Sequence, residues 1–221
     1  MLHNVVTHLP LMGNVIFAAG TAAIVSVVAA VTVVPLVSHL FLTPRYDYDG
    51  KHVVVTGGSS GIGLESAKLY AQRGANVTLV ARDPIKLAAA VVAVAAYAKP
   101  GRAVNSASVD TSSSEVAVAA ALAPALAAAG DVDVLVNCAG TSMAGAFDAA
   151  DGGAAFERML RVNVLGSVYP TRAVLCGMKR RGGGRVVFVA SQVAQAALHG
   201  YAAYAASKWA LRGLAEVRGE R

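Results

Sequence analysis

The stretch His52–Gly63, HVVVTGGSSGIG, decides how the chain is expected to fold. A short apolar strand, His52–Thr56, runs directly into the glycine turn Gly57–Gly63. A helical pattern follows from Leu64 to Gln72 and stops at Gly74. Glycines allow a tight turn and a close approach of the backbone to a pyrophosphate, while a helix N-terminus presents unpaired N–H groups. Strand, glycine turn and helix in this order therefore indicate a dinucleotide-binding site rather than an ordinary turn.

Length and composition limit the classes of protein to consider. A chain of 221 residues suggests one domain with a possible appendage. The net charge of +6 is modest, and the basic cluster Lys179–Arg181 lies at an expected helix C-terminus, where cations complement the helix dipole. We therefore expect no nucleic-acid partner. Cys138 and Cys176, the two cysteines, provide neither a disulfide framework nor metal-ligand spacing, so we expect no metal site.

The N-terminal region reads as a membrane anchor. No Lys, Arg, Asp or Glu precedes Arg45. The apolar run between Pro10 and Pro35 is about 24 residues long and would span ~36 Å as a helix, enough for a bilayer core. The alternatives are a buried core helix, which is rarely this long, and a cleaved signal peptide, which needs a basic start. We expect residues 1–44 to form an anchor with its flanks and residues 45–221 to form the cofactor-binding domain, with Arg45 and Lys51 favouring its cytosolic placement.

Strands and helices alternate through the rest of the chain. Further strands are expected at Asn76–Ala81, Ala103–Val109, Val132–Val136 and Arg185–Val189. The helices expected between and after them include Pro84–Tyr97, one opening at the capping box Ser112–Glu115, Phe156–Met178 and Tyr201–Val217. This alternation predicts an α/β fold with a doubly wound, Rossmann-like parallel sheet.

The end of the second strand bears on the choice of cofactor. An acidic residue near this point holds the ribose 2′-hydroxyl of NAD, whereas a cation accommodates the 2′-phosphate of NADP. Arg82 stands here, followed by Asp83, and Lys86 lies one helical turn further on. The alternative is an ordinary exposed arginine. The sequence favours NADPH/NADP, with Arg82 and Lys86 as cofactor-binding residues.

Three residues near the C-terminal end suggest catalysis. Tyr204 and Lys208 are four residues apart and share one helix face, while Ser191 follows the fifth strand. A nearby ammonium favours the phenolate of a tyrosine, as a general acid/base requires. A surface tyrosine beside a solvated lysine is the alternative, because this spacing alone occurs by chance. Ligands bind at the carboxyl ends of parallel strands, so Ser191 and the glycine turn strengthen the catalytic interpretation.

These features together resemble the short-chain dehydrogenase/reductase family from Lys51 to the end of the chain. The matching motifs are the G-x-x-x-G-x-G turn within Thr56–Gly63, Asn137–Gly140, Asn163, Ser191, and the pair Tyr204 and Lys208. The resemblance implies that Gly57, Ser59, Ser60, Gly61, Ile62 and Gly63 hold the cofactor.

The resemblance also implies individual roles. Tyr204 would donate a proton to a carbonyl, Lys208 would hold the nicotinamide ribose, and Ser191 would hydrogen-bond the substrate oxygen. Asn163 would position a water that links Lys208 to solvent; without the resemblance, it would read as a polar residue at a helix kink. Asp110 would contact the adenine, and Asn137 would brace the central strands.

A branch of this family reduces the keto group of a long-chain sphingoid base with NADPH at the cytosolic face of the endoplasmic reticulum. Thr78–Arg82, Asn163–Pro170 and Gly184–Val189 resemble this branch, as does the expected anchor. An anchored steroid or retinol dehydrogenase is the alternative enzyme, and an inactive fragment the alternative from another class. Family members continue beyond the helix that bears Tyr204 and Lys208, so we expect this domain to be incomplete at its C-terminus. A homodimer through Phe156–Met178 and Tyr201–Val217 is expected from the same resemblance.

Overall fold

The computed structural model describes residues 26–36, 46–148 and 152–217. The chain divides into two compact units, Met1–Tyr46 and Asp47–Arg221, which are considered separately. The second unit contains every residue expected to bind cofactor or substrate.

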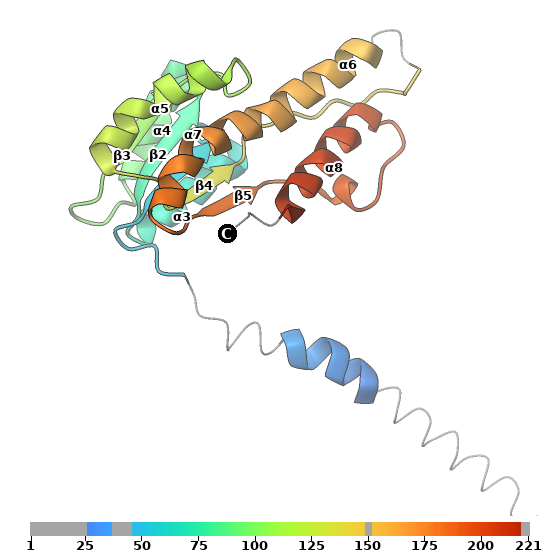
Figure 1. Ribbon diagram of the computed structural model, residues 1–221, viewed down its shortest axis with the longest axis horizontal. Helices are drawn as coiled ribbons and strands as arrows, with labels where there is room; N and C mark the ends of the chain where they lie inside the picture. The colour runs from blue at the N-terminus through green and yellow to red at the C-terminus, as the bar shows by residue number, and fades with distance from the viewer. Residues whose placement is uncertain (1–25, 37–45, 149–151, 218–221) are drawn as a thin grey trace, which may run out of the picture. The chain divides into compact units, whose positions relative to one another are not determined.

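A parallel sheet of five strands forms the centre of the second unit (Figure 1). The strands are β1 (His52–Thr56), β2 (Asn76–Ala81), β3 (Val104–Ser108), β4 (Val134–Asn137) and β5 (Arg185–Phe188). Their spatial order is β3-β2-β1-β4-β5, with β1 between β2 and β4. The predicted doubly wound α/β fold is confirmed, and the strand boundaries differ from the expected ones by at most two residues.

Burial explains why these segments become strands. All five residues of β1 are buried, because helices cover both faces of the sheet. Such a strand needs apolar side chains on both faces, and Val53–Val55 provide them. The edge strand β5 alternates between exposed and half-buried residues instead.

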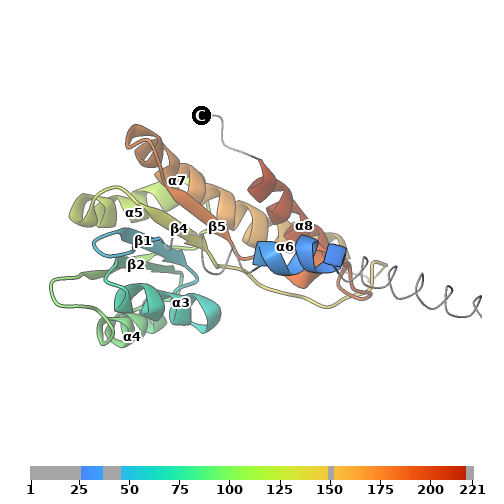
Figure 2. The same cartoon turned by 90° about the horizontal axis from the view of Figure 1, so that it is seen from below.

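Helices lie in two layers, one on each face of the sheet (Figure 2). The helices α3 (Gly61–Gln72) and α4 (Pro84–Ala95) cover one face, and α5 (Glu115–Ala129) and α7 (Gly166–Arg180) cover the other. Side chains of Asp83 and Ser114 cap the N-termini of α4 and α5. One cluster of core side chains fills the space between the sheet and the α5–α7 layer; its members are Val54, Val80, Ala107, Val118, Leu122, Val132, Leu135, Val174 and Met178.

The long helix expected at Phe156–Met178 has three parts in the structure. An α-helical segment, α6 (Gly152–Met159), continues through a π-helical segment, η2 (Leu160–Leu165), into α7. π-Helical segments often occur at functional sites, and Asn163 lies inside this one. A short 3₁₀ helix, η3 (Gln192–Ala194), and then α8 (Ala202–Glu216) complete the described domain.

The expected membrane anchor lies mostly outside the described residues. Residues 26–36 are helical around a π-helical centre, η1 (Ala29–Val33), and expose Val27, Val31 and Val34. Within the part of the chain that the structure describes, no helix is long and apolar enough to cross a membrane.

Candidate functional site

The glycine turn connects β1 to α3 under tight steric constraint. Gly57 has φ +67°, and a Cβ atom there would lie 2.9 Å from backbone atoms of Ala139. A Cβ on Gly63 would collide with the carbonyl oxygen of Gly57. The backbone therefore requires glycine at both positions, because any side chain would collide with neighbouring backbone atoms of the domain itself.

Gly61 of the turn has open space around its Cα atom. A Cβ on Gly61, at φ +52°, would meet no atom within 4 Å. Ser60 is the N-cap of α3, but its side chain makes no capping hydrogen bond there. The first N–H groups of α3 therefore remain free of a side-chain cap, as a phosphate-binding helix N-terminus requires.

The cavity at the carboxyl edge of the sheet has two lobes. One lobe, of about 330 Å³, is lined by Gly57, Ser59, Ser60, Arg82, Asp83, Lys86, Asp110, Thr111, Arg158 and Val162 among others. The other, of about 480 Å³, is lined by Gly57, Ser60, Ile62, Gly63, Cys138, Val189, Tyr204 and Lys208 among others. Both lobes share the glycine turn and Ala139–Thr141. The two lobes and the turn between them suit the two halves of a dinucleotide and its pyrophosphate.

The first lobe contains the cations Arg82, Lys86 and Arg158 and two carboxylates. The Lys86 Nζ lies 4.0 Å from the Asp83 carboxylate, with which it forms an ion pair. The Asp83 carboxylate accepts hydrogen bonds from the backbone N–H groups of Ile85, 3.0 Å, and Lys86, 3.1 Å. The Asp110 carboxylate accepts from the hydroxyl and the backbone N–H of Ser112, and these bonds lower its pKa. Asp83 is thus occupied as a helix cap, while Arg82 and Lys86 line the lobe.

The second lobe brings together the predicted catalytic pair. The Lys208 Nζ lies 5.8 Å from the centroid of the Tyr204 ring and donates a 2.8 Å hydrogen bond to the carbonyl of Val189. Lys208 is buried, and burial lowers its pKa, although the nearby Cys138 opposes the shift. Burial likewise raises the pKa of the Cys138 thiol. An ammonium at this depth, beside a phenol that lines the same lobe, suits proton transfer to a bound ligand.

Asn163 joins the loop after β4 to α8. Its Oδ1 accepts from the N–H of Thr141, 2.8 Å, and its Nδ2 donates to the carbonyl of the same residue, 3.0 Å. The Nδ2 also donates to the Ser207 hydroxyl, 2.9 Å, which in turn donates to the Tyr204 carbonyl, 2.7 Å. Asn163 is fully buried, and these contacts link the π-helical segment to the turn that carries Tyr204. Its expected role in positioning a water stays a prediction.

Four predicted site residues, Gly61, Asn137, Asn163 and Ser191, do not line either lobe. Ser191 follows β5 as the N-cap of η3, and its Oγ accepts from the N–H of Val193 at 3.4 Å. Asn137 is buried, and its Nδ2 donates to the Thr171 hydroxyl of α7. The side chain of Asn137 thus holds the inner strand β4 against α7, and its expected role in bracing the central strands stays a prediction.

Sequence reasoning did not single out three residues that shape this site. Thr56 Oγ1 accepts from the N–H groups of both Cys138 and Ala139, each at 3.1 Å, and so ties β1 to the loop after β4. Ser207 lies between Tyr204 and Lys208 in the same helix. Nothing in the sequence distinguishes it from a serine on the helix surface, although it is buried in the structure. Arg158 reaches the first lobe from α6. Only the position of Thr56, at a strand end before the glycine turn, provided a usable signal.

Comparison with known proteins agrees with this geometry. Residues 51–220 match the short chain dehydrogenase family. A 3-dehydrosphinganine reductase of Danio rerio is 47% identical over 192 residues, covering 86% of this chain and 58% of that protein. A 3-ketodihydrosphingosine reductase of Bos taurus is 46% identical over 196 residues, covering 88% of this chain and 59% of that protein. The chain thus spans less than two thirds of the length of these relatives.

Solved structures share the fold. An NAD⁺-bound xylitol dehydrogenase superimposes with a TM-score of 0.70 at 29% identity, covering 76% of this chain and 64% of that one. The apo form of LigO from Sphingobium sp. strain SYK-6 has the same TM-score of 0.70 at 33% identity, covering 78% of this chain and 63% of that one. Motifs, sheet order and family match agree, and the chain belongs to the short-chain dehydrogenase family.

Proposed function

We propose that this chain carries the cofactor-binding and proton-donating parts of an NADPH-dependent reductase that converts the keto group of 3-ketosphinganine to the alcohol of sphinganine. The observation that carries the proposal is the shared cavity in which Tyr204 and Lys208 face the glycine turn. Family membership supports an oxidoreductase acting on a carbonyl or alcohol. Relatives named for the sphingoid ketone support the substrate.

The proposed chemistry divides between cofactor and protein. A bound nicotinamide supplies the hydride that reduces the carbonyl carbon. Tyr204 donates the proton that the carbonyl oxygen needs, and the Lys208 ammonium stabilises the phenolate that remains. The hydrogen bond from Lys208 to the Val189 carbonyl orients the ammonium for this role. Ser191 would hydrogen-bond the substrate oxygen.

Preference for NADPH over NADH rests on the first lobe. Recognition of an unphosphorylated ribose requires a free carboxylate, and Asp83 is occupied by the N-terminus of α4. Arg82 and Lys86 instead present positive charge where the 2′-phosphate would lie. The NAD⁺-bound neighbour supports a nicotinamide dinucleotide in general, and these two cations favour the phosphorylated form.

We also propose an N-terminal anchor in the endoplasmic reticulum membrane, with the catalytic domain in the cytosol. The uncharged apolar run Leu11–Val34 and the exposed valines of residues 26–36 support it. A long-chain base partitions into bilayers, so an anchored domain would meet it more often. Extraction of membranes with alkaline carbonate tests the anchor, and protease protection of microsomes tests the orientation.

A homodimer through α7 and α8 is a further proposal. Leu175 on α7 and Trp209 and Leu214 on α8 are partly exposed apolar side chains that a second copy could cover. Sedimentation equilibrium of residues 47–221 measures the mass directly, and a monomer at all concentrations would reject the dimer.

Product analysis tests the function. The full chain is incubated with NADPH and 3-ketosphinganine, and in parallel with a panel of ketosteroids and retinal. Formation of sphinganine alone supports the proposal. Reduction of a steroid or retinal without reduction of the sphingoid ketone would assign the chain to another branch of the family. Absence of NADPH binding, measured by fluorescence of the single tryptophan Trp209, would indicate that this chain is not an enzyme by itself.

A further inference from the structure

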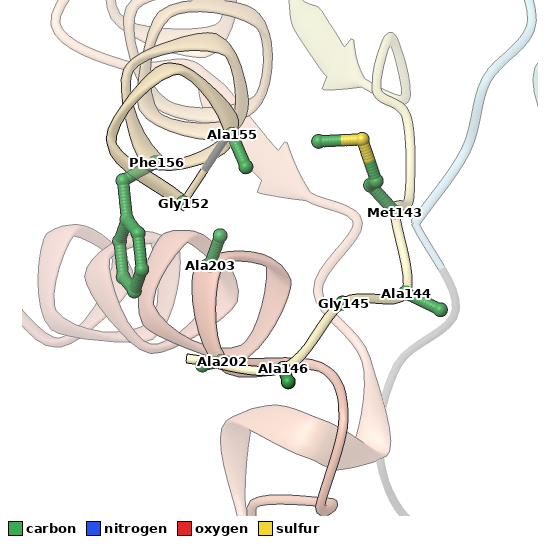
Figure 3. Close-up of a pocket in the computed structure, with 9 residues that line it drawn as sticks. All are labelled: Met143, Ala144, Gly145, Ala146, Gly152, Ala155, Phe156, Ala202 and Ala203. Atoms are coloured by element: carbon green, nitrogen blue, oxygen red, sulfur yellow. The ribbon is translucent and has the colours of Figure 1, made fainter. Parts of the chain in front are cut away.

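A second, smaller hollow lies beside the catalytic helix (Figure 3). The N-terminal ends of α6 and α8 and the loop after β4 enclose it. Its lining includes the alanines Ala144, Ala146, Ala155, Ala202 and Ala203, together with Phe156. Ala155 of α6 and Ala203 of α8 point toward each other across it in Figure 3. No charged side chain lines this apolar slot.

The apolar slot and the catalytic lobe share no lining residue, but they are neighbours along two chain segments. Thr141 and Ser142 line the catalytic lobe, and the next residue, Met143, lines the slot. Along α8, Ala203 directly precedes Tyr204. A substrate whose carbonyl oxygen meets Tyr204 would therefore have the slot as its neighbouring surface.

Two exposed apolar side chains extend this surface outward. Phe147 is 77% exposed and Leu198 is 58% exposed. Their loops lie side by side, because the N–H of Gly145 donates a 2.7 Å hydrogen bond to the carbonyl of Gly200. The Phe147 ring also contacts the Phe156 ring of the slot, with centroids 5.7 Å apart. An apolar path thus runs from the start of the catalytic helix to the surface of the domain.

We propose that the slot and this path bind the hydrocarbon chain of the substrate. The proposal rests on the proposed function and adds a binding site for the part of the substrate that does not react. The slot itself measures about 30 Å³ and holds only the methylenes nearest the carbonyl, while the remainder of the chain lies over Phe147 and Leu198. The lining has no charged side chain that could pair with a charged headgroup. The slot therefore suits the hydrocarbon side of the ketone rather than the headgroup side.

Filling the slot tests the proposal. In Ala155→Leu the added side chain occupies the slot, whereas Ala154→Leu places the same side chain on the exposed neighbouring position of α6. Ala202→Leu fills the slot from α8, so that an effect shared with Ala155→Leu cannot come from damage to one helix. Each full-chain variant is assayed with 3-ketosphinganine and with a short ketone that carries only a methyl group on the alkyl side of its carbonyl, so that it has no methylene to place in the slot, and NADPH affinity is measured in parallel.

The expected result is a change in chain-length selectivity. Each methylene that loses its burial weakens binding about fourfold, so both slot variants should raise the KM for the long-chain ketone about tenfold relative to the short ketone. NADPH affinity should stay unchanged, and Ala154→Leu should behave as the wild type. An unchanged ratio of the two KM values in both slot variants would overturn the proposal.

A photoreactive probe tests the alkyl-chain site independently of whether the protein reduces the sphingoid ketone. A long-chain sphingoid base with a diazirine on its chain is irradiated with the full-length protein, and the labelled residues are located by mass spectrometry. Labelling within residues 143–147 or 152–156 that is lost in Ala155→Leu supports the alkyl site, even if the wild type reduces no sphingoid ketone. Labelling confined to other segments overturns the site, even if the ketone is reduced.

Discussion

The side-chain amide of Asn163 donates a 2.9 Å hydrogen bond to the hydroxyl of Ser207, across 44 residues of sequence. The same hydroxyl donates to the carbonyl of Tyr204, so the turn of α8 that bears the proposed proton donor is tied to η2. Because Asn163 also holds both backbone polar groups of Thr141, one side chain sets the positions of α8 and the loop beside the cofactor cavity.

Ser207→Ala should slow turnover more than it weakens cofactor binding. The variant loses two buried hydrogen bonds, at a cost of about 1–3 kcal/mol, and a small displacement of Tyr204 should lower kcat roughly tenfold. Ser207→Thr keeps the hydroxyl and should restore most of the rate. Steady-state kinetics with NADPH titration provide the measurement; a change confined to the melting temperature would mean that Ser207 has only a structural role.

Tyr204→Phe should abolish reduction while NADPH still binds. Phenylalanine retains the ring beside the Lys208 Nζ, 5.8 Å from its centroid, but has no proton to donate. Turnover should fall by a factor of at least ~10², as measured by product formation in a form of the protein that is active. Appreciable turnover in this variant would disprove the acid role.

Arg82→Ala should weaken NADPH binding about tenfold and leave NADH binding nearly unchanged. The guanidinium lines the lobe where a 2′-phosphate would lie, and a charge-assisted hydrogen bond contributes ~1.5–3 kcal/mol. Fluorescence titration with both cofactors gives the ratio. Equal weakening of NADPH and NADH binding would show that Arg82 does not distinguish them.

Gly63→Ala should disrupt the glycine turn. The new Cβ would collide with the Gly57 carbonyl oxygen, and such overpacking costs about 1–3 kcal/mol. Gly213→Ala is the matched control, because a Cβ there meets no atom within 4 Å, and alanine in a helix interior is more favourable by ~1 kcal/mol. Urea denaturation should show opposite changes in the free energy of unfolding. Equal stability of the two variants would contradict the steric argument.

His52 should make the fold sensitive to acid. The carbonyl of Gly130 can only accept, so Nδ1 carries the proton of the neutral ring, and Nε2 accepts from the Thr78 hydroxyl. Burial lowers the pKa of His52 below its ordinary value of 6.5, against the opposing effects of the Gly130 hydrogen bond and the Asp133 charge. The folded state therefore binds fewer protons than the unfolded state, and stability falls as the pH drops below 6.5.

Variants of His52 give the corresponding measurement. The pH is lowered from about 7 to about 5, across the ordinary pKa of histidine. Over this range the free energy of unfolding of His52→Gln should change less than that of the wild type. His199→Gln, at an exposed position, should leave the wild-type pH dependence in place. An identical slope in all three proteins would exclude His52 as the group responsible.

The architecture was predictable because it rests on local patterns. A run of consecutive apolar residues such as Val53–Val55 is typical of a strand that is buried on both faces of a sheet. The glycines that follow allow the tight strand-to-helix turn of a dinucleotide-binding fold. The spacing of Tyr204 and Lys208 within one helix places them on one face whatever surrounds them. Helix boundaries were less certain: α3 begins at Gly61, which has a left-handed φ of +52°, three residues before the expected start, because Ile62 and Gly63 already belong to its first turn.

The sequence by itself determined the order of strands and helices along the chain, the glycine turn after β1, and the place of Tyr204 and Lys208 on one helix, since each depends on residues close together in the chain. Only the tertiary structure decided which polar groups are already committed. Asn137 reaches α7, and Asn163 meets Thr141 and Ser207. A hydrogen bond between residues far apart in the chain depends on how the helices pack against the sheet. The sequence alone does not show whether a given asparagine or serine side chain already has such a hydrogen-bond partner.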